Sequence, residues 1–344
     1  MNQHMDSQQP IMTINIPFFQ YPVPDKRNFA LYEVNFNVHA MDSIAILGES
    51  GSGKSTLLKI LAGLLDLQKK NQVCMLSSSN NLTPLANIPR KPRYGRLQIV
   101  FQDNMGSLYE KETIQSSLKH IARIKKQKEK TVFSTAQQFF EDLRLISHQA
   151  SADTKSSHPD TETSHLDSFQ TFMKKQVVQL SMGMLRRFCL AKSLLLLDIY
   201  EPHQQVAPKV LLVDEISRGL DQDTKKELIA FLLEVRKRYH LSIIAISHEL
   251  DFLKEFCHDF YFLFEGLMIP RCYTQNELSL ENCHQIDNVY LKRYFIPCEE
   301  PDQKNKTSQQ LSTGCYFQQF YDCPEASSRC QTSNIQKETP WICS

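Results

Sequence analysis

Residues 48–56, GESGSGKST, have the residue types and the spacing of a loop that binds phosphate groups. They fit the pattern G-x-x-x-x-G-K-[ST], with a short apolar run before the loop and a helical pattern from Lys54 onward. The glycines let the backbone wrap with its N–H groups pointing inward, where side chains would block a phosphate. We expect Lys54 to reach the β- and γ-phosphates, and the Ser55 hydroxyl to bind Mg²⁺. The sequence therefore predicts a nucleoside triphosphate site made of Gly48, Glu49, Ser50, Gly51, Ser52, Gly53, Lys54, Ser55 and Thr56.

Two later apolar runs each deliver polar side chains to the end of an expected strand. The first run ends at Asp214 and Glu215, and the second ends at His248. The helix expected between them, over residues 222–239, has apolar residues at the i, i+3, i+4, i+7 spacing. Strands that alternate with helices predict a parallel sheet covered on both faces, and such sheets place ligands at the carboxyl ends of their strands.

The N-terminal part predicts a different kind of sheet. Residues 34–38 alternate apolar and polar side chains, which is the pattern of a half-buried antiparallel strand. Tyr21 lies in a turn-rich stretch before that strand. Its flat ring is either a stacking surface for an adenine or an ordinary core or surface side chain. Its rivals for the stacking role are Phe18, Phe19 and Phe29.

Between these parts the patterns vary. Residues 66–96 are mostly polar and irregular, which indicates a surface excursion. Residues 97–101 read as a buried strand that ends at Gln102. Residues 111–145 look helical and strongly basic, which suits a solvated face or a contact with lipid headgroups or a membrane subunit. Residues 147–168 have few apolar side chains and predict a flexible loop in which the histidines do not form a metal site.

Composition excludes several classes of protein. The chain of 344 residues has 39 basic and 38 acidic side chains, so no nucleic-acid partner is implied. No apolar run approaches the ~20 residues of a membrane span. Residues 1–10 are polar and lack the core of a signal peptide, so we expect the chain to stay in the cytosol. The cytosol is reducing, and the ten cysteines are therefore not expected to form a disulfide framework.

Five stretches occur in a fixed order, namely GESGSGKST, FQDNMGSL, LSMGMLRR, LLVDEISRGLD and AISHEL. This order resembles the nucleotide-binding subunit of ATP-binding cassette (ABC) transporters over residues 12–270, and FQDxxxSL is particularly similar to the importers of peptides and nickel. The resemblance implies an α/β fold with a RecA-like P-loop NTPase core and an antiparallel β subdomain. It also implies an ATP-binding domain over residues 11–270, with a helical subdomain at about 103–192, and a cysteine-rich C-terminal extension over residues 271–344.

The resemblance also assigns roles. It identifies Gln102 with the Q-loop, Asp221 with the D-loop and His248 with the switch histidine. Mg²⁺ would be held by Ser55, Gln102 and Asp214. Glu215 would polarise the water that attacks the γ-phosphate, and His248 would hydrogen-bond that phosphate.

The family signature LSGGQ reads Leu180-Ser181-Met182-Gly183-Met184 here, and we call residues 180–184 the signature segment. Ser181 is expected to cap a helix, and the resemblance implies that Ser181 and Gly183 meet a γ-phosphate from the opposite subunit. Met182 would strain the backbone if φ there is positive. A weakened signature would impair the partner's site and leave this chain's own site intact, so the partner is expected to be a different ATP-binding chain.

The resemblance further implies two transmembrane permease subunits, an indirect link to a substrate-binding protein, and a peripheral position on the cytoplasmic face of the inner membrane. Two alternatives remain at this point. One is a soluble ABC protein that acts on ribosomes or DNA, and the other is a regulatory ATP-binding subunit with little turnover.

The last part of the chain holds Cys315, Cys323, Cys330 and Cys343 in a segment with little apolar content. Their spacing does not suit a zinc knuckle, whose ligands come in C-x₂₋₄-C pairs. Four thiolates from long loops can instead surround a [4Fe–4S] cluster, and some peptide importers carry one on this extension. Unligated cysteines on a loose tail are the alternative, and Cys298 is a possible substitute ligand.

Overall fold

The computed structural model describes residues 9–21, 29–67, 72–76, 81–89, 93, 95–101, 111–146, 168–197, 208–269 and 272–278. The chain divides into two compact units. The first consists of residues 1–21 and 29–272 and carries the elements discussed below. Of the second, which consists of residues 22–28 and 273–344, the described part is residues 273–278, including the short strand β11 (Tyr273–Thr274).

A parallel sheet forms the centre of the first unit, as the alternation of strands and helices predicts. Its strands lie in the order β9–β3–β8–β7–β6, and each pair is parallel. All residues of β3, β7 and β8 are buried, as expected for strands covered on both faces. The strands are β3 (Ser43–Leu47), β6 (Leu97–Val100), β7 (Lys209–Asp214), β8 (Leu241–Ile246) and β9 (Asp259–Phe264).

Antiparallel strands continue the sheet beyond β9. β1 (Met12–Gln20) pairs antiparallel with both β2 (Phe29–Val38) and β4 (Gln72–Leu76). β4 in turn pairs with β5 (Leu82–Pro84), which is followed by a single 3₁₀ turn, η1 (Leu85–Asn87). β10 (Leu267–Met268) joins β2 to β9. Side chains 34, 36 and 38 are buried while 35 and 37 are exposed, which confirms the predicted alternation.

One expectation for this region is wrong. Residues 66–96 were expected to be irregular, but residues 72–76 form β4. Val73 pairs with Ile14, and both Val73 and Met75 are almost fully buried. Burial of these alternate apolar side chains against β1 outweighs the polar character of the flanking sequence.

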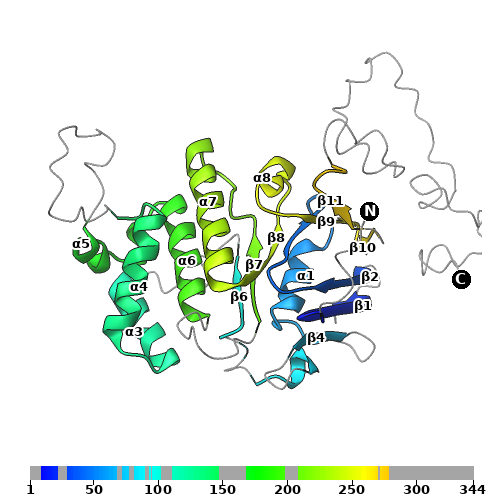
Figure 1. The fold of residues 1–344 in the computed structure, drawn as a ribbon, viewed down its shortest axis with the longest axis horizontal. Helices are drawn as coiled ribbons and strands as arrows, with labels where there is room; N and C mark the ends of the chain where they lie inside the picture. Colours follow the sequence, from blue (N-terminus) through cyan, green and yellow to red (C-terminus); the bar gives the residue numbers. More distant parts are fainter. Residues whose placement is uncertain are drawn as a thin grey trace, which may run out of the picture. The chain divides into compact units, whose positions relative to one another are not determined.

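Helices cover the parallel sheet on both faces (Figure 1). α1 (Lys54–Leu61) contacts both β7 and β2, so it packs between the parallel strands and the antiparallel ones. α6 (Met182–Leu196) contacts β6 and α7 (Gln222–Tyr239) contacts β8 on the other side. The helix predicted over residues 222–239 is confirmed, and the apolar residues with that spacing are buried, namely Leu228, Phe231, Leu232 and Val235.

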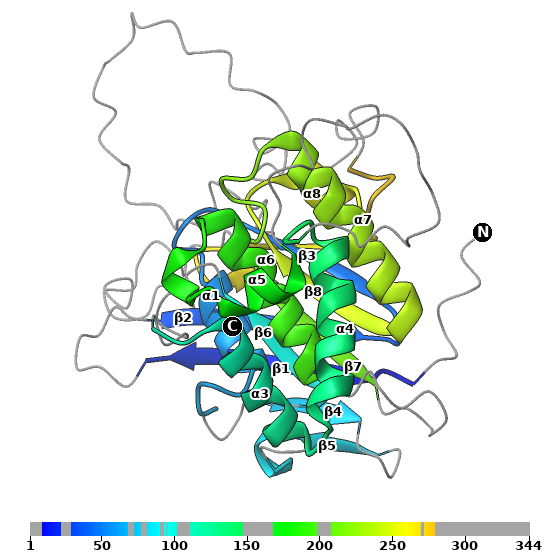
Figure 2. The same ribbon diagram turned by 90° about the vertical axis from the view of Figure 1, so that its left-hand side faces the viewer.

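A group of helices extends from α6 (Figure 2). Phe140 is fully buried there, with ring centroids 5.3 Å from Phe172 and 5.9 Å from Phe188. The basic residue Lys125 is not only a solvated charge, because its Nζ donates to the last carbonyls of α6, those of residues 196 and 197. The group comprises α3 (Ile114–Lys125), α4 (Glu129–Asp142), α5 (Phe169–Lys174) and the 3₁₀ turn η4 (Val177–Gln179). In the described part of the chain, no helix combines the length and hydropathy needed to cross a membrane.

Candidate functional site

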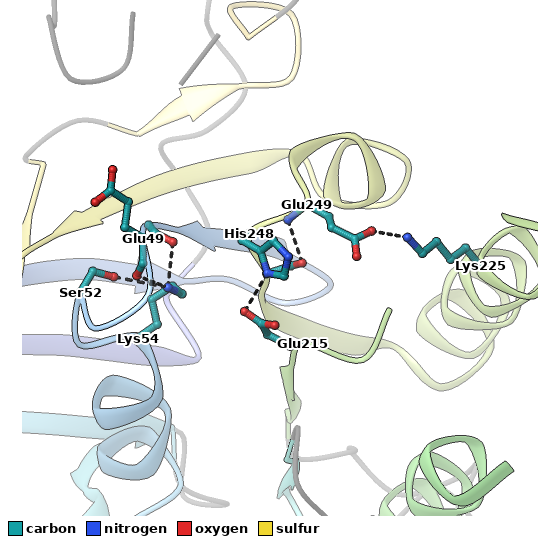
Figure 3. Close-up of polar contacts among 9 residues, drawn as sticks. Glu49, Ser52, Lys54, Glu215, Lys225, His248 and Glu249 are labelled. Carbon is teal, nitrogen blue, oxygen red and sulfur yellow. Dashed lines mark hydrogen bonds and ion pairs between the residues drawn. The ribbon is translucent and has the colours of Figure 1, made fainter. Parts of the chain in front are cut away.

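Three loops leave the parallel sheet at the same edge and at the same level. Ile246 of β8 pairs with Ile46 of β3 on one side and with Asp214 of β7 on the other. Because the strands are parallel, the residues that follow them emerge together. The predicted phosphate-binding loop, the pair Asp214–Glu215 and His248 therefore converge, as Figure 3 shows for Lys54, Glu215 and His248.

The structure explains why glycine is required at three positions of the loop. A Cβ atom on Gly48 would lie 2.2 Å from the backbone oxygen of Leu263, so no other residue fits without moving β9. Gly51 and Gly53 have φ values of 84° and 98°, which side-chain-bearing residues rarely adopt. A Cβ on Gly53 would also approach the Ala30 oxygen to 2.5 Å. The loop thus takes a shape that the glycine pattern makes possible.

Lys54 is the first residue of α1 and is only 7% exposed. Its Nζ donates to the carbonyl oxygens of Gly48 at 2.8 Å and Glu49 at 2.6 Å. Burial lowers its pKa, while the nearby carboxylates of Glu215 and Asp214 act to raise it. The ammonium group is thus held over the loop and within electrostatic reach of the two carboxylates at the end of β7.

Asp214 is 6% exposed at the end of β7. Burial and the neighbouring Glu215 raise its pKa to about 6, while Lys54 and a hydrogen bond with Ser55 act to lower it. The exposed Ser55 and the Asp214 carboxylate therefore lie side by side. Oxygen ligands of this kind suit Mg²⁺, so the two residues fit the predicted metal role.

Glu215 and His248 form a hydrogen-bonded pair. His248 Nδ1 lies 3.0 Å from Glu215 Oε1. The other oxygen, Oε2, is buried and has no hydrogen-bond partner among the described residues. Glu215 has a φ of 45°, and its N–H donates to the Ile246 carbonyl at 2.8 Å, which ties the residue to β8. A buried, unpaired carboxylate oxygen beside the phosphate-binding loop is a ready acceptor for a ligand or a water.

The remaining predicted contacts lie on the starts of two helices. Ser181 caps α6 as expected, because its Oγ accepts from the Met184 N–H at 3.3 Å. Asp221 caps α7 by accepting from the N–H of Thr224 at 2.9 Å. A Cβ on Gly183 would lie 3.4 Å from Leu220, so the start of α6 packs beside the turn before α7.

The condition for backbone strain at Met182, a positive φ, is not met. Met182 is the first residue of α6, with helical backbone angles, and it is not one of the described residues with positive φ. Its side chain is 53% exposed. Replacing glycine by methionine therefore changes what the surface presents and leaves the backbone unstrained.

Tyr21 lies next to the phosphate-binding loop. Its hydroxyl is 3.0 Å from Thr56 Oγ1, and its ring meets Phe19 edge to face at 5.4 Å. Phe19 is only 3% exposed, so its ring belongs to the core and is not available to a nucleotide. The side chain of Phe29, like Gln102 and the cysteines Cys298, Cys315, Cys323, Cys330 and Cys343, lies outside the described residues.

The site also includes an ion pair that no sequence motif predicts. Lys225 of α7 forms an ion pair with Glu249, the residue after His248, at 2.5 Å. The two residues lie on separate elements, and their spacing follows no helix or strand period. Their only sequence signal is that each falls within four residues of a predicted site residue, Asp221 or His248.

A family model described as ABC transporter matches residues 31–217, more than half of the chain. The chain belongs to the ABC transporter family. This ABC ATPase is similar to the Nickel import ATP-binding protein NikE of Shigella boydii serotype 4 (strain Sb227), with 26% identity over 256 residues, 73% of this chain and 81% of the relative. The protein of the same name from Escherichia coli O157:H7 is 28% identical over 231 residues, 66% of this chain and 72% of the relative.

Solved structures agree on the fold. CbiO1 from Clostridium perfringens, described as part of the ABC transporter complex cbiONQ, aligns with a TM-score of 0.57 and 21% identity over 78% of this chain and 90% of the other. The dimeric structure of MJ0796, a bacterial ABC transporter cassette, aligns with a TM-score of 0.58 and 18% identity over 77% of this chain and 98% of the other.

In the part of the ABC ATPase that the structure describes, no group of three or more His, Cys, Asp or Glu side chains could hold a metal ion.

Proposed function

We propose that this ABC ATPase powers a membrane importer of peptides, nickel or a similar small solute from the cytoplasmic face of the inner membrane. The observation that carries the proposal is the convergence of Lys54, Asp214, Glu215 and His248 at one edge of the sheet. The similarity to proteins named for nickel import supports the choice of importer class.

Hydrolysis of ATP needs placement of the phosphates and neutralisation of charge more than covalent chemistry. Lys54, at the loop, offsets charge on the β- and γ-phosphates. Glu215 accepts a hydrogen bond from the attacking water through its unpaired Oε2 and so orients that water. His248 holds the other oxygen of Glu215 and faces the γ-phosphate from β8.

Mg²⁺ would be bound by Ser55 and Asp214, which lie together, and by Gln102. When bound, the ion supplies a positive charge that offsets the charge developing on the phosphates. Tyr21 is proposed to stack on the adenine, because its hydroxyl already contacts Thr56 of the phosphate-binding loop.

The second half of each nucleotide site is proposed to come from another ATP-binding chain, paired head to tail with this one. Ser181, Gly183 and Asp221 would face the partner's γ-phosphate. Because Met182 and Met184 weaken that surface, the partner is proposed to be a different chain with a fuller signature, bound with this one to two permease subunits and served by a substrate-binding protein. Damage to Lys54 should then reduce transport more than damage to the equivalent lysine of the partner.

Glu215→Gln tests the proposed catalytic role. The variant should bind Mg·ATP like the parent, because no phosphate or metal contact is removed, while turnover should fall by about 10² to 10⁴. Glu234→Gln, an exposed change on α7, is the matched control and should leave turnover unchanged. Hydrolysis at the parent rate by Glu215→Gln in the assembled transporter would contradict the proposal. Co-purification with ribosomes instead of two membrane proteins would contradict the importer assignment.

The four cysteines Cys315, Cys323, Cys330 and Cys343 are proposed to bind a [4Fe–4S] cluster. The support is the number of cysteines and the scarcity of apolar side chains around them. A segment without an apolar core needs another source of stability, and in a reducing compartment a bound metal is favoured over disulfides. Anaerobic purification, metal analysis and a visible spectrum test this. Iron and sulfide should be lost together in Cys323→Ser, whereas bound zinc, or no metal in anaerobic material, would overturn it.

A further inference from the structure

The ion pair between Lys225 and Glu249 joins two elements that carry site residues. Lys225 Nζ lies 2.5 Å from Glu249 Oε2, and Figure 3 shows the Glu249 side chain between His248 and Lys225. Lys225 lies in the first turn of α7, and Glu249 is the residue before α8 (Leu250–Lys254). The pair therefore spans the gap between the start of α7 and the loop after β8.

Each member of the pair is tied to the site by a further contact. The Lys225 N–H donates to the carbonyl of Asp221 at 3.0 Å, which places it one turn after the cap of α7. The Glu249 N–H donates to Ser247 Oγ at 3.0 Å, and Glu249 follows His248 directly. Since His248 in turn contacts Glu215, the contacts form a closed ring that runs from Glu215 through the turn to α7, across the ion pair and back through His248.

The pair is partly buried, so its loss should have a larger energetic effect than the loss of an exposed surface pair. The side chains of Lys225 and Glu249 are 17% and 25% exposed. The neighbouring pair on the same helix, Lys226 with Asp223, is 3.7 Å apart and 76% and 88% exposed. Exposed pairs contribute little because water and salt screen them, whereas a partly buried charge that loses its partner is destabilised and moves toward solvent.

We propose that Lys225 and Glu249 are positioning residues that hold His248 against Glu215 for ATP hydrolysis. The inference rests on the proposed function, in which Glu215 and His248 act on the water and the γ-phosphate. Loss of the Lys225 ammonium frees the Glu249 carboxylate, and the loop after β8 then turns to hydrate that carboxylate. The His248 ring moves with the loop, because no residue separates it from Glu249. ATP binding is unaffected, since among the described residues no hydrogen bond or ion pair joins the phosphate-binding loop to Lys225 or Glu249.

The test measures kcat, KM and the Kd for Mg·ATP on the full-length chain, purified with the proteins that accompany it. Lys225→Met removes the charge and keeps most of the side chain, and Glu249→Gln removes the opposite charge. Each should lower kcat by about 10- to 100-fold, as a displacement of about 1 Å at a reacting group does, with KM and Kd within about twofold. Lys225→Arg and the double exchange Lys225→Glu with Glu249→Lys should restore most of kcat. Lys226→Met, which removes the exposed neighbouring pair, is the matched control and should match the parent.

A kcat for Lys225→Met equal to the parent overturns the inference, and so does a double exchange that is no better than the single variants. If the affinity for Mg·ATP falls in parallel with kcat, the pair has only a general structural role, and the inference is also overturned. Glu215→Gln is run beside these variants. If its turnover equals the parent's, the proposed function has failed; if it loses turnover while Lys225→Met does not, only the positioning inference has failed.

Discussion

His248 Nδ1 lies 3.0 Å from Glu215 Oε1, and the two side chains differ sharply in exposure, 53% for the histidine and 13% for the glutamate. The imidazole is therefore the more solvent-accessible member of the pair, and the carboxylate is the more buried one. The second carboxylate oxygen is buried and has no hydrogen-bond partner in the described part of the chain. One oxygen is thus fixed by the histidine while the other stays available, which is the arrangement needed to orient a single water.

The first prediction follows from this pair. His248→Ala should lower ATP hydrolysis by about 10² to 10⁴ and leave the Kd for Mg·ATP within a few-fold, because Lys54 and Ser55 are untouched. His240→Asn is a suitable control, since His240 ends α7 in the left-handed conformation that asparagine tolerates. Phosphate release and nucleotide binding are measured on both variants. Parent-like hydrolysis in His248→Ala would remove this histidine from the mechanism.

The second prediction concerns Lys54. Lys54→Ala should weaken ATP binding by at least about tenfold, since a buried ammonium held at the loop is lost. The measurement is the rise in unfolding temperature that ATP causes, because a ligand that binds only the folded chain stabilises it by mass action. The parent and the exposed control Lys59→Ala should show that rise, and Lys54→Ala should show little of it. An equal rise in all three would refute the role.

The third prediction compares two glycines of the same loop. Gly48→Ala places a Cβ 2.2 Å from the backbone oxygen of Leu263, so β9 or the loop must move and nucleotide binding should be lost. Gly51→Ala meets no atom within 4 Å and suffers only the strain of a positive φ, about 1–2 kcal/mol. Circular-dichroism melts and nucleotide titrations of both variants separate the two effects. A milder defect in Gly48→Ala than in Gly51→Ala would contradict the loop geometry.

The central part of the fold is accessible from the sequence because local patterns determine it. The glycine spacing marks the turn after β3, and the apolar spacing in α7 is regular over its whole length. β4 is harder to predict, because it is a short run in which Val73, Met75 and Leu76 are buried and polar residues surround it. Its formation depends on pairing with β1, a long-range contact that no local period records.

The site is predictable only in part for the same reason. Asp214 ends one buried strand, and Glu215 and His248 follow buried strands, so their position at one edge can be inferred from a parallel sheet. Glu215, which is hydrogen-bonded to His248, has a positive φ that the sequence does not signal, because glutamate rarely adopts it. The Lys225–Glu249 pair depends on how α7 sits beside β8, and that placement is a property of packing.

The fourth prediction concerns the signature segment, residues 180–184. Met182 is helical and 53% exposed, so its effect comes from a bulky apolar surface where a partner's phosphate would lie. Met184 follows the cap residue Ser181 by three positions, where a glutamine can bond back to the Ser181 N–H and complete a capping box. Met182→Gly with Met184→Gln should therefore raise the ATPase rate of the assembled complex severalfold, through a surface that admits phosphate and a better-ordered start of α6.

Two single variants separate these contributions. Met184→Gln alone should raise the unfolding temperature slightly, since a cap interaction contributes on the order of 1 kcal/mol. Met182→Gly alone should lower it slightly, because glycine costs about 0.5–1 kcal/mol in a helix, yet it should raise turnover. A variant that unfolds at a lower temperature than the parent but hydrolyses ATP faster does not owe its faster turnover to general stabilisation. If the double variant hydrolyses ATP no faster than the parent in the complex, the methionines do not weaken the shared site, and the case for an asymmetric pair of ATP-binding chains falls with them.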